Sequence, residues 1–183
     1  MKVGIVGQKW LGESVFKALS KELQIVFVAA PLKGDRLAEA SKEAGLEPVI
    51  HGEHGLAGIF PPCKLDLLIA AHTFVHIPAE LRSAADWCIG YHPSLLPLHR
   101  GRNAVEAAVA AGDKVTGGTA FHLDEGFDTG PIAFQDWCFI GRQETPADLW
   151  RRALAPIGVD LLVKAASHLL DYGFIPGEEQ AVL

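Results

Sequence analysis

Apolar runs of strand length alternate with stretches of helical periodicity through the first half of the chain. The strand-like runs cover residues 3–6, 25–30, 48–50 and 65–71. The helical patterns cover residues 11–23, 35–44 and 78–82. Alternation of this kind is typical of βαβ units, in which parallel strands are covered by helices. We therefore predict an α/β fold that is Rossmann-like over the first two thirds of the chain.

The remaining part of the chain has a different order of elements. A strand over residues 87–92 is followed by a loop that contains Pro and Gly, 93–101, and then by an Ala-rich helix from about 102 to 111. Two further strand-like segments, 116–123 and 132–140, are separated by a connection that contains several glycines. Glycines suit a looped turn, so we expect a hairpin-like connection between these two strands.

A strong helix start follows the last strand. Thr145 is a capping residue, Pro146 suits the first helical position, and Asp148 lies three residues after the cap. These residues predict a long helix that runs toward Leu170. Because proline lacks a backbone N–H, we expect a kink at Pro156.

Size and composition indicate one globular domain over residues 1–183. A chain of 183 residues is long enough to bury a core and is close to the usual size of a single domain. Hydrophobic residues make up 49% and charged residues 21% of the chain, which argues against disorder and against a fibrous repeat. We predict a single domain whose mostly parallel sheet is flanked by helices.

Charge and cysteine usage exclude several classes of protein. The net charge is -6 and no Lys/Arg cluster is longer than the Arg100 and Arg102 pair, so we expect no binding to nucleic acid. Cys63, Cys88 and Cys138 form no CxxC pair, which predicts free thiols in a reducing cytosol. The sequence shows no signal-length apolar segment at its start and no run of 18 apolar residues. We therefore expect a cytoplasmic protein that does not bind or span a membrane.

His92 stands at the end of an apolar strand and is followed by residues that restrict the backbone. Residues 91–101 read YHPSLLPLHRG, and Pro93 biases His92 toward extended backbone angles. An imidazole at the carboxyl edge of a parallel sheet lies where such folds bind ligands. Taken alone, however, a single His at a strand end is more often structural than catalytic.

Asp128 changes that balance because it lies in a Gly-rich loop that can direct a carboxylate toward an imidazole. A His paired with an Asp works as a general acid or base near neutral pH, since the carboxylate orients the ring and stabilises its cation. The alternative is a solvated loop acid, which is the state expected of Asp124 and Glu125. Distance along the sequence does not establish a contact between His92 and Asp128.

Residues 7–12, Gly-Gln-Lys-Trp-Leu-Gly, connect the first strand to the first helix. The N–H groups at a helix start can receive a phosphate or a carboxylate. The segment matches neither GxGxxG nor GxxxxGK[ST], because Lys9 and Glu13 occupy positions that those motifs give to Gly and Lys. A structural turn and a substrate or anion site both stay open.

A metal site is not expected. His51 with His54, and His72 with His76, have spacings that suit chelation, but no HExxH or matching carboxylate motif accompanies them. The segment that begins at His72 follows a strand and could line a pocket. Its default interpretation is an ordinary connection between a strand and a helix.

These motifs together resemble the formyltransferase family that uses 10-formyltetrahydrofolate, over nearly the whole chain. Residues 92–97 with 100–101 are similar to the family's HPSLLP..RG signature. Residues 124–131, DEGFDTGP, are similar to its DEGxDTGP loop, and TGGT at 116–119 also fits. The family includes glycinamide ribonucleotide and methionyl-tRNA formyltransferases and the hydrolase domain of 10-formyltetrahydrofolate dehydrogenase.

The resemblance implies a Rossmann-like formyltransferase domain with His92 and Asp128 as its catalytic residues. It also implies that two segments hold the pterin ring of the cosubstrate 10-formyltetrahydrofolate: His72, Thr73, Phe74, Val75, His76 and Ile77, and Leu123, Asp124, Glu125, Gly126 and Phe127. Candidate contacts to the acceptor are Gly7, Gln8, Lys9, Trp10, Gly12, Arg100, Arg102 and Asn103. The expected partners are folate and a small-molecule amine, and the oligomeric state stays open.

The chain departs from the family pattern at Gly90, where the family usually has a catalytic Asn two positions before the His. Tyr91 should point to the opposite face of the strand from His92, so it is a poor replacement. Loss of one oxyanion donor typically costs roughly 100- to 1000-fold in rate. The non-Asn residue and the Tyr-His-Pro-Ser run bring the chain closer to the hydrolase domain than to the purine enzyme. We expect Gly90 to enlarge this corner of the site.

Three functions are therefore to be distinguished. The first is transfer of the formyl group from 10-formyltetrahydrofolate to an amine of an unidentified small acceptor. The second is hydrolysis of the same cosubstrate to formate, with water in place of the amine. The third is a folate-binding module without catalysis, and retention of both His92 and Asp128 counts against it.

Overall fold

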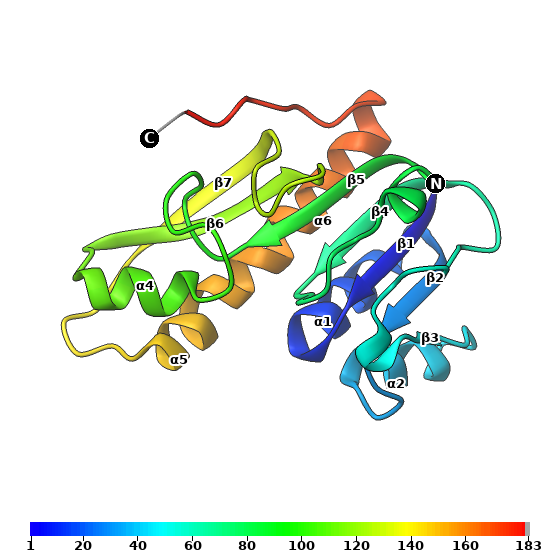
Figure 1. Ribbon diagram of the computed structural model, residues 1–183, viewed down its shortest axis with the longest axis horizontal. Coiled ribbons are helices and arrows are strands. Elements are labelled where there is room, and N and C mark those ends of the chain that lie inside the picture. Colours follow the sequence, from blue (N-terminus) through cyan, green and yellow to red (C-terminus); the bar gives the residue numbers. More distant parts are fainter. Residues whose placement is uncertain (182–183) are drawn as a thin grey trace. The chain divides into compact units, whose positions relative to one another are not determined.

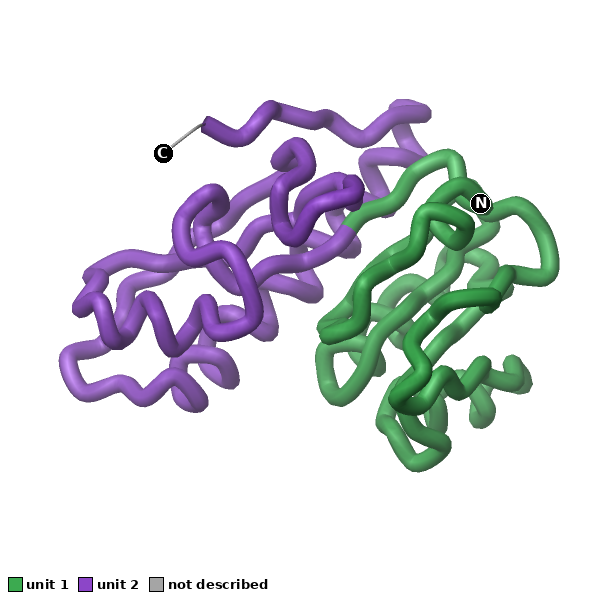
Figure 2. The backbone as a smooth tube through the Cα atoms, in the orientation of Figure 1, with its two compact units in different colours: residues 1–89 green, residues 90–183 purple. Residues whose placement is uncertain are grey.

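The computed structural model describes residues 1–181. The chain divides into two compact units, Met1–Ile89 and Gly90–Leu183 (Figure 2). The prediction of one domain over residues 1–183 stays a prediction.

Within residues 1–181, seven strands form a sheet in the order β3-β2-β1-β4-β5-β6-β7 (Figure 1). Their bounds are β1 Lys2–Gly7, β2 Gln24–Ala30, β3 Val49–Ile50, β4 Leu65–Ala71, β5 Ala85–His92, β6 Val115–His122 and β7 Ile132–Phe139. β1 pairs in parallel with β2 and β4, and β2 pairs in parallel with β3. β6 and β7 are antiparallel, as expected for a hairpin-like connection. The predicted α/β class with a mostly parallel sheet is confirmed.

In the first unit, two helices pack on each other and on the first strands (Figure 1). They are α1 (Lys9–Leu19) and α2 (Arg36–Glu43), and a short α3 (Ala79–Arg82) precedes β5. β1 is buried from Val3 onward, because a strand covered on both faces must be apolar throughout. The Asp35 side chain caps α2 by accepting a hydrogen bond from the Leu37 N–H. Helix and strand packing thus fixes the loops that follow β1 and β4.

In the second unit, α4 (Ala104–Ala111) precedes β6, and a long helical stretch follows β7. The stretch consists of α5 (Pro146–Leu149), a π-helical turn (Trp150–Leu154) and α6 (Ala155–Tyr172). α6 packs along β6 and β7 (Figure 1). The π-helical turn ends at Leu154, two residues before Pro156, whose missing N–H interrupts regular helical bonding. The predicted cap is present, since Thr145 Oγ1 accepts the Asp148 N–H at 3.2 Å.

The helical stretch Pro146–Tyr172 is long and apolar enough to cross a membrane by length and composition. Half of its most apolar window is buried inside the structure. Leu161, Leu162, Ala165, Ala166 and Leu169 make up much of its buried face. Burial of that kind is what the core helix of a globular unit requires.

The predicted elements differ from the observed ones mainly at their ends. The helix expected from residue 102 begins at Ala104, because Asn103 has φ -108° and ψ 36°, outside the helical region. The helix expected over 11–23 covers Lys9–Leu19. Apolar periodicity identifies the buried face of a helix but not its first and last turns, whose ends depend on local backbone angles.

Tyr91 joins β5 to the long helix of its own unit. Its hydroxyl donates a hydrogen bond to the Leu154 carbonyl at 2.6 Å, and its ring lies against Gly118 and Gly158. Burial raises the pKa of Tyr91 well above its ordinary value, so the hydroxyl stays protonated and remains a donor. Tyr91 thus faces the helix, and the expectation that it points away from the His92 side of the strand is confirmed.

Replacing Tyr91 with Phe should lower the free energy of unfolding by about 1 kcal/mol, because one hydrogen bond is lost while the ring remains. Urea denaturation measures the change. Tyr172→Phe is the matched control, since Tyr172 is 68% exposed and its variant should stay within about 0.5 kcal/mol of wild type. Equal stability of the two variants would contradict the assigned role of the Tyr91 hydroxyl.

Candidate active site

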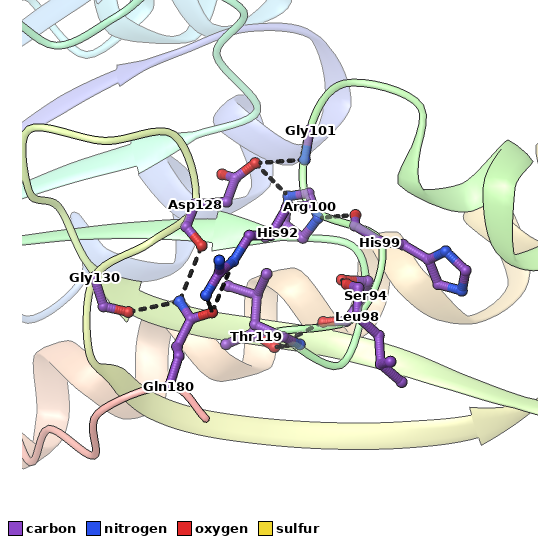
Figure 3. A network of polar contacts seen from close by, with 11 residues as sticks. His92, Ser94, Leu98, His99, Arg100, Gly101, Thr119, Asp128, Gly130 and Gln180 are labelled. Atoms are coloured by element: carbon purple, nitrogen blue, oxygen red, sulfur yellow. Dashed lines mark hydrogen bonds and ion pairs between the residues drawn. The ribbon is translucent and has the colours of Figure 1, made fainter. Parts of the chain in front are cut away.

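The second unit brings His92 and Asp128 into contact. His92 is the last residue of β5, and its side chain is almost completely buried. Its Nδ1 lies 3.3 Å from Oδ2 of Asp128 (Figure 3). Asp128 comes from the loop between β6 and β7, 36 positions further along the chain by subtraction of the residue numbers. The structure therefore supplies the contact that the sequence could not establish.

The two nitrogens of His92 have different partners. Nε2 lies 2.8 Å from the His99 carbonyl oxygen, which can only accept, so Nε2 carries a proton in this contact. Nδ1 faces the carboxylate of Asp128. A neutral ring donates on the Nε2 side alone, whereas an imidazolium donates on both sides. Nδ1 is therefore the nitrogen that can gain and release a proton beside Asp128.

His99 is itself held in place by a second pair. Its Nε2 lies 2.7 Å from Oδ2 of Asp113, and both side chains are partly buried. The contact with Asp113 holds His99 in place, and the His99 carbonyl accepts the hydrogen bond from His92 Nε2. Sequence reasoning missed His99 and Asp113 as supporting residues, because neither belongs to a catalytic motif.

Asp128 is held by its backbone as well as by its carboxylate. Its φ is 57°, a left-handed conformation that few residues other than Gly adopt. Oδ2 accepts a hydrogen bond from the Gly101 N–H at 2.9 Å. The same oxygen therefore faces both Gly101 and His92, which restricts where the carboxylate can lie.

Asp124 organises the loop that carries Asp128. Its carboxylate accepts the Gly126 N–H at 3.0 Å and the Thr129 hydroxyl at 2.8 Å and 2.9 Å. A Cβ at Gly126 would lie 2.0 Å from Thr129 Oγ1, so a side chain there would displace the hydroxyl that Asp124 holds. Asp124 is a half-exposed loop acid, and its carboxylate is in addition bonded within the turn. Glu125 is exposed, as expected of a solvated loop acid.

The loop after His92 is braced by one hydroxyl of β6. Thr119 Oγ1 donates to the Ser94 carbonyl at 2.7 Å and accepts the Leu96 N–H at 3.1 Å. The side-chain amide of Gln135 on β7 also donates to Thr119 at 2.8 Å. The loop contains a cis peptide bond between Leu96 and Pro97. Thr119 belongs to the TGGT run, but its bracing function and the part played by Gln135 appear only in three dimensions.

The corner beside Gly90 is occupied by apolar side chains. A Cβ at Gly90 would lie 2.8 Å from Leu123 Cδ2 and 3.3 Å from Phe121 Cε1. The expectation that Gly90 enlarges this corner is therefore wrong, because Leu123 fills the space. Leu123 and Phe121 therefore place apolar atoms beside position 90, where the family pattern has the amide of an Asn.

The first unit gathers a group of predicted site residues at the carboxyl ends of β1 and β4. The Lys9 N–H donates to both carboxylate oxygens of Asp35, at 3.1 Å and 2.9 Å. Lys9 Nζ lies 5.7 Å from the centre of the Phe74 ring. The rings of Phe74 and His72 meet edge to face at 5.1 Å. Members of two predicted segments, 7–12 and 72–77, are thus brought together in this unit.

The remaining predicted contacts have varied surroundings. Trp10 and Phe127 are exposed, whereas the Ile77 side chain is buried in the core. Thr73 accepts the Val75 N–H at 3.3 Å. Arg100 donates to Gln180. Binding roles for these residues stay predictions, as does the expected absence of a metal, although residues 1–181 contain no cluster of three His, Cys, Asp or Glu placed to hold one.

His72 should remain neutral down to about pH 4. Burial, and then the Lys9 ammonium, lower its pKa from 6.5 to about 4, against a smaller opposite effect of Asp35. Because this pKa is depressed in the folded state, the stability that depends on neutral His72 is complete above pH 6.5 and is lost as the pH falls toward 4. Urea denaturation at several pH values should show this loss in wild type and not in His72→Asn.

Asn is the matched replacement because it tolerates the left-handed backbone that His72 adopts at φ 59°. Titration of the His72 ring proton by NMR measures the same property directly. A midpoint near 6.5 would contradict the inference.

Comparison with known proteins supports a family assignment. Residues 18–165 match the profile of the family described as formyl transferase. Mitochondrial 10-formyltetrahydrofolate dehydrogenase of Mus musculus is 30% identical over 185 residues, which cover 93% of this chain and 20% of that protein. Methionyl-tRNA formyltransferase of Halothermothrix orenii is 44% identical over 94 residues, which cover 51% of this chain and 29% of that protein. The chain therefore spans about a fifth of the length of the dehydrogenase.

Solved structures share the fold. Glycinamide ribonucleotide transformylase 1 from Symbiobacterium toebii has a TM-score of 0.81 at 20% identity and covers 100% of this chain and 94% of its own. HypX from Aquifex aeolicus in complex with tetrahydrofolic acid has a TM-score of 0.71 at 20% identity, covering 99% of this chain and 28% of its own. With the profile match over residues 18–165, the shared fold and the sequence similarity show that this chain belongs to the formyl transferase family.

Proposed function

We propose that the chain transfers the formyl group of 10-formyltetrahydrofolate to an amine of a small-molecule acceptor. The observation that carries this proposal is the 3.3 Å contact between His92 Nδ1 and Asp128 Oδ2. It provides a nitrogen that can exchange a proton next to a carboxylate that stabilises the cation. Family membership supports the formyl group as the unit that is transferred. The tetrahydrofolic acid named with a HypX of the same fold supports folate as its carrier.

His92 acts as the general acid and the general base of this reaction. The acceptor nitrogen forms a bond to the formyl carbon, and the carbonyl electron pair moves onto the oxygen, to which the His92 Nδ1–H donates. Collapse of the tetrahedral intermediate breaks the bond between that carbon and N10. As N10 departs, Nδ1 gives its proton to N10, and the neutral imidazole then takes the proton that the acceptor nitrogen releases, so the atoms and the charges balance. General acid and base catalysis of this type typically contributes about 100- to 10,000-fold in rate.

Asp128 stabilises the imidazolium and directs Nδ1. Its Oδ2 accepts the Gly101 N–H, which holds the carboxylate beside the ring rather than in solvent. The His99 carbonyl holds the opposite nitrogen at 2.8 Å. The ring is therefore oriented before substrate binds, and pre-orientation lowers the entropic part of the barrier.

The proposed binding surfaces follow the predicted segments. Residues 72–77 and 123–127 would contact the pterin ring. Residues 7–12, with Arg102 and Asn103, would contact the acceptor. Arg100 would join them with its remaining N–H groups, because Gln180 receives two of its five.

Removal of either member of the pair should abolish most of the activity. His92→Ala and Asp128→Asn should each lower kcat by about 100-fold or more, because proton transfer and cation stabilisation are lost. Consumption of 10-formyltetrahydrofolate in the presence of a panel of small amines measures the rate. Full formyl transfer by His92→Ala would reject the mechanism, and tight folate binding without turnover by wild type would assign a binding module instead.

Hydrolysis to formate is the second candidate. Two observations favour it: similarity to 10-formyltetrahydrofolate dehydrogenases and the apolar Leu123 at the position of the family's amide donor. Both reactions use the same pair, with water replacing the amine as the nucleophile. Product analysis separates them, because free formate in the absence of an amine identifies hydrolysis and a formylated amine identifies transfer.

Shortening Leu123 clears space for an amide at position 90. Gly90→Asn alone should gain nothing, because its Cβ would lie 2.8 Å from Leu123 Cδ2. Gly90→Asn combined with Leu123→Ala should exceed Leu123→Ala alone by about tenfold in kcat for formyl transfer, since a new donor faces the developing oxyanion. Single-turnover kinetics measures the difference. Equal rates in the two Leu123→Ala backgrounds would show that the missing amide does not limit this enzyme.

A further inference from the structure

Gln180, in the segment that follows α6, has a side-chain amide with a hydrogen-bond partner for each of its groups. Nε2 donates to the Asp128 carbonyl at 2.9 Å and to the Gly130 carbonyl at 2.8 Å. Oε1 accepts from Nε and Nη2 of Arg100, at 3.1 Å and 2.6 Å (Figure 3). An amide has two donor hydrogens and an oxygen with two lone pairs, so this group is saturated.

The orientation of the Gln180 amide is dictated by its neighbours. Two carbonyl oxygens face one end, and a guanidinium faces the other. Carbonyls only accept and guanidinium only donates, so the reversed amide would satisfy none of these contacts. Gln180 therefore joins two loops: its N–H groups bond to carbonyl oxygens of the loop between β6 and β7, and its oxygen bonds to Arg100 in the loop after β5.

These contacts close a ring around the carboxylate of Asp128. Gln180 links the Asp128 backbone to Arg100, and Gly101, the next residue, donates its N–H to Asp128 Oδ2. Figure 3 shows Gln180 on one side of the Asp128 backbone and Gly101 on the other side of its carboxylate. The ring fixes both the main chain and the side chain of a residue at φ 57°. A left-handed conformation of this kind is unfavourable for an L-residue and persists where its surroundings determine it.

The segment that carries Gln180 is anchored to the sheet. Glu178 and Ile132 exchange both backbone hydrogen bonds, at 2.7 Å and 2.9 Å, as an antiparallel bridge beside the start of β7. This bridge precedes Gln180 by two residues and brings its side chain to the loop between β6 and β7. The amide is therefore held in place by main-chain contacts that do not involve the catalytic pair.

We propose that Gln180 is a positioning residue for Asp128. By holding the Asp128 and Gly130 carbonyls and linking them to Arg100, it sets the place of the carboxylate that faces His92 Nδ1. The proposal rests on the proposed function, because it assigns Gln180 a part in that reaction. Gln180 acts through Asp128 and contacts none of the reacting atoms.

Gln180→Glu is the sharpest variant because it has the same shape. It keeps an acceptor for Arg100 but loses both donors and turns a carboxylate oxygen toward two carbonyls. Gln180→Ala removes the amide without adding charge. Glu179→Gln is the matched control, since Glu179 is the exposed neighbour of Gln180 in the same segment.

Kinetics should distinguish positioning from substrate binding. Gln180→Glu and Gln180→Ala should each lower kcat by roughly 10- to 100-fold, because a catalytic group displaced by about 1 Å loses rate on this scale. The KM for 10-formyltetrahydrofolate should change by less than about twofold, since ground-state binding is unaffected. The midpoint of the pH–rate profile should also move, whereas a loosened fold would lower the rate equally at all pH values. Glu179→Gln should match wild type in each measurement.

The Gly101 amide reports the position of Asp128 without any turnover. In ¹⁵N-labelled wild type its N–H is bonded to Oδ2, so its proton resonance should lie downfield and exchange slowly. Both Gln180 variants should shift this resonance upfield and speed its exchange, and Glu179→Gln should leave it unchanged. Thermal unfolding confirms that the variants are folded.

The outcomes separate the two proposals. If wild type fails to turn over 10-formyltetrahydrofolate, the proposed function fails, and the Gly101 resonance alone then tests whether Gln180 positions Asp128. If wild type is active and both variants keep its kcat and its Gly101 resonance, the positioning proposal is overturned. Loss of the folded state in both variants would also overturn it, because Gln180 would then stabilise the unit rather than position one residue.

Discussion

The proposed chemistry of this protein depends on one imidazole, that of His92, which is held between two hydrogen-bond acceptors. The His99 carbonyl fixes Nε2 of His92, and the Asp128 carboxylate faces Nδ1. Because only one nitrogen is committed to the backbone, the other can exchange a proton beside a group that stabilises its cation. The loops around His92 hold its ring in this orientation and leave Nδ1 able to exchange a proton.

The supporting contacts are mostly hydrogen bonds between side chains and backbone rather than ion pairs. Thr119 ties the loop after β5 to β6, Asp124 closes the turn before Asp128, and Gln180 joins two loops. Buried polar groups are stable only when they are hydrogen-bonded, so each of these side chains also constrains the backbone that it satisfies. Rigidity at Asp128 is thus distributed over segments that lie far apart in the sequence.

Gly90 stands where the family pattern has an Asn, and the Leu123 side chain lies in the space beside it. An Asn at this position would present an amide near the end of β5, but glycine leaves room that a leucine side chain occupies. Protein interiors are close-packed, so a smaller residue is commonly matched by a neighbour that fills its space. In the proposed reaction, transition-state stabilisation then depends on the His92 and Asp128 pair and on the donors that surround it.

Apolar periodicity in the sequence determined the class and order of the elements, and two local motifs identified His92 and Asp128, because both signals are carried by residues close together in the chain. Helix ends were displaced by one to four residues, since they depend on local backbone angles such as those of Asn103. Only the tertiary structure decided that His92 meets Asp128, that Leu123 fills the space beside Gly90, and that Gln180 reaches the loop between β6 and β7. Those contacts join segments separated by tens of residues, and their formation depends on how the sheet brings loop ends together rather than on any pattern within one segment.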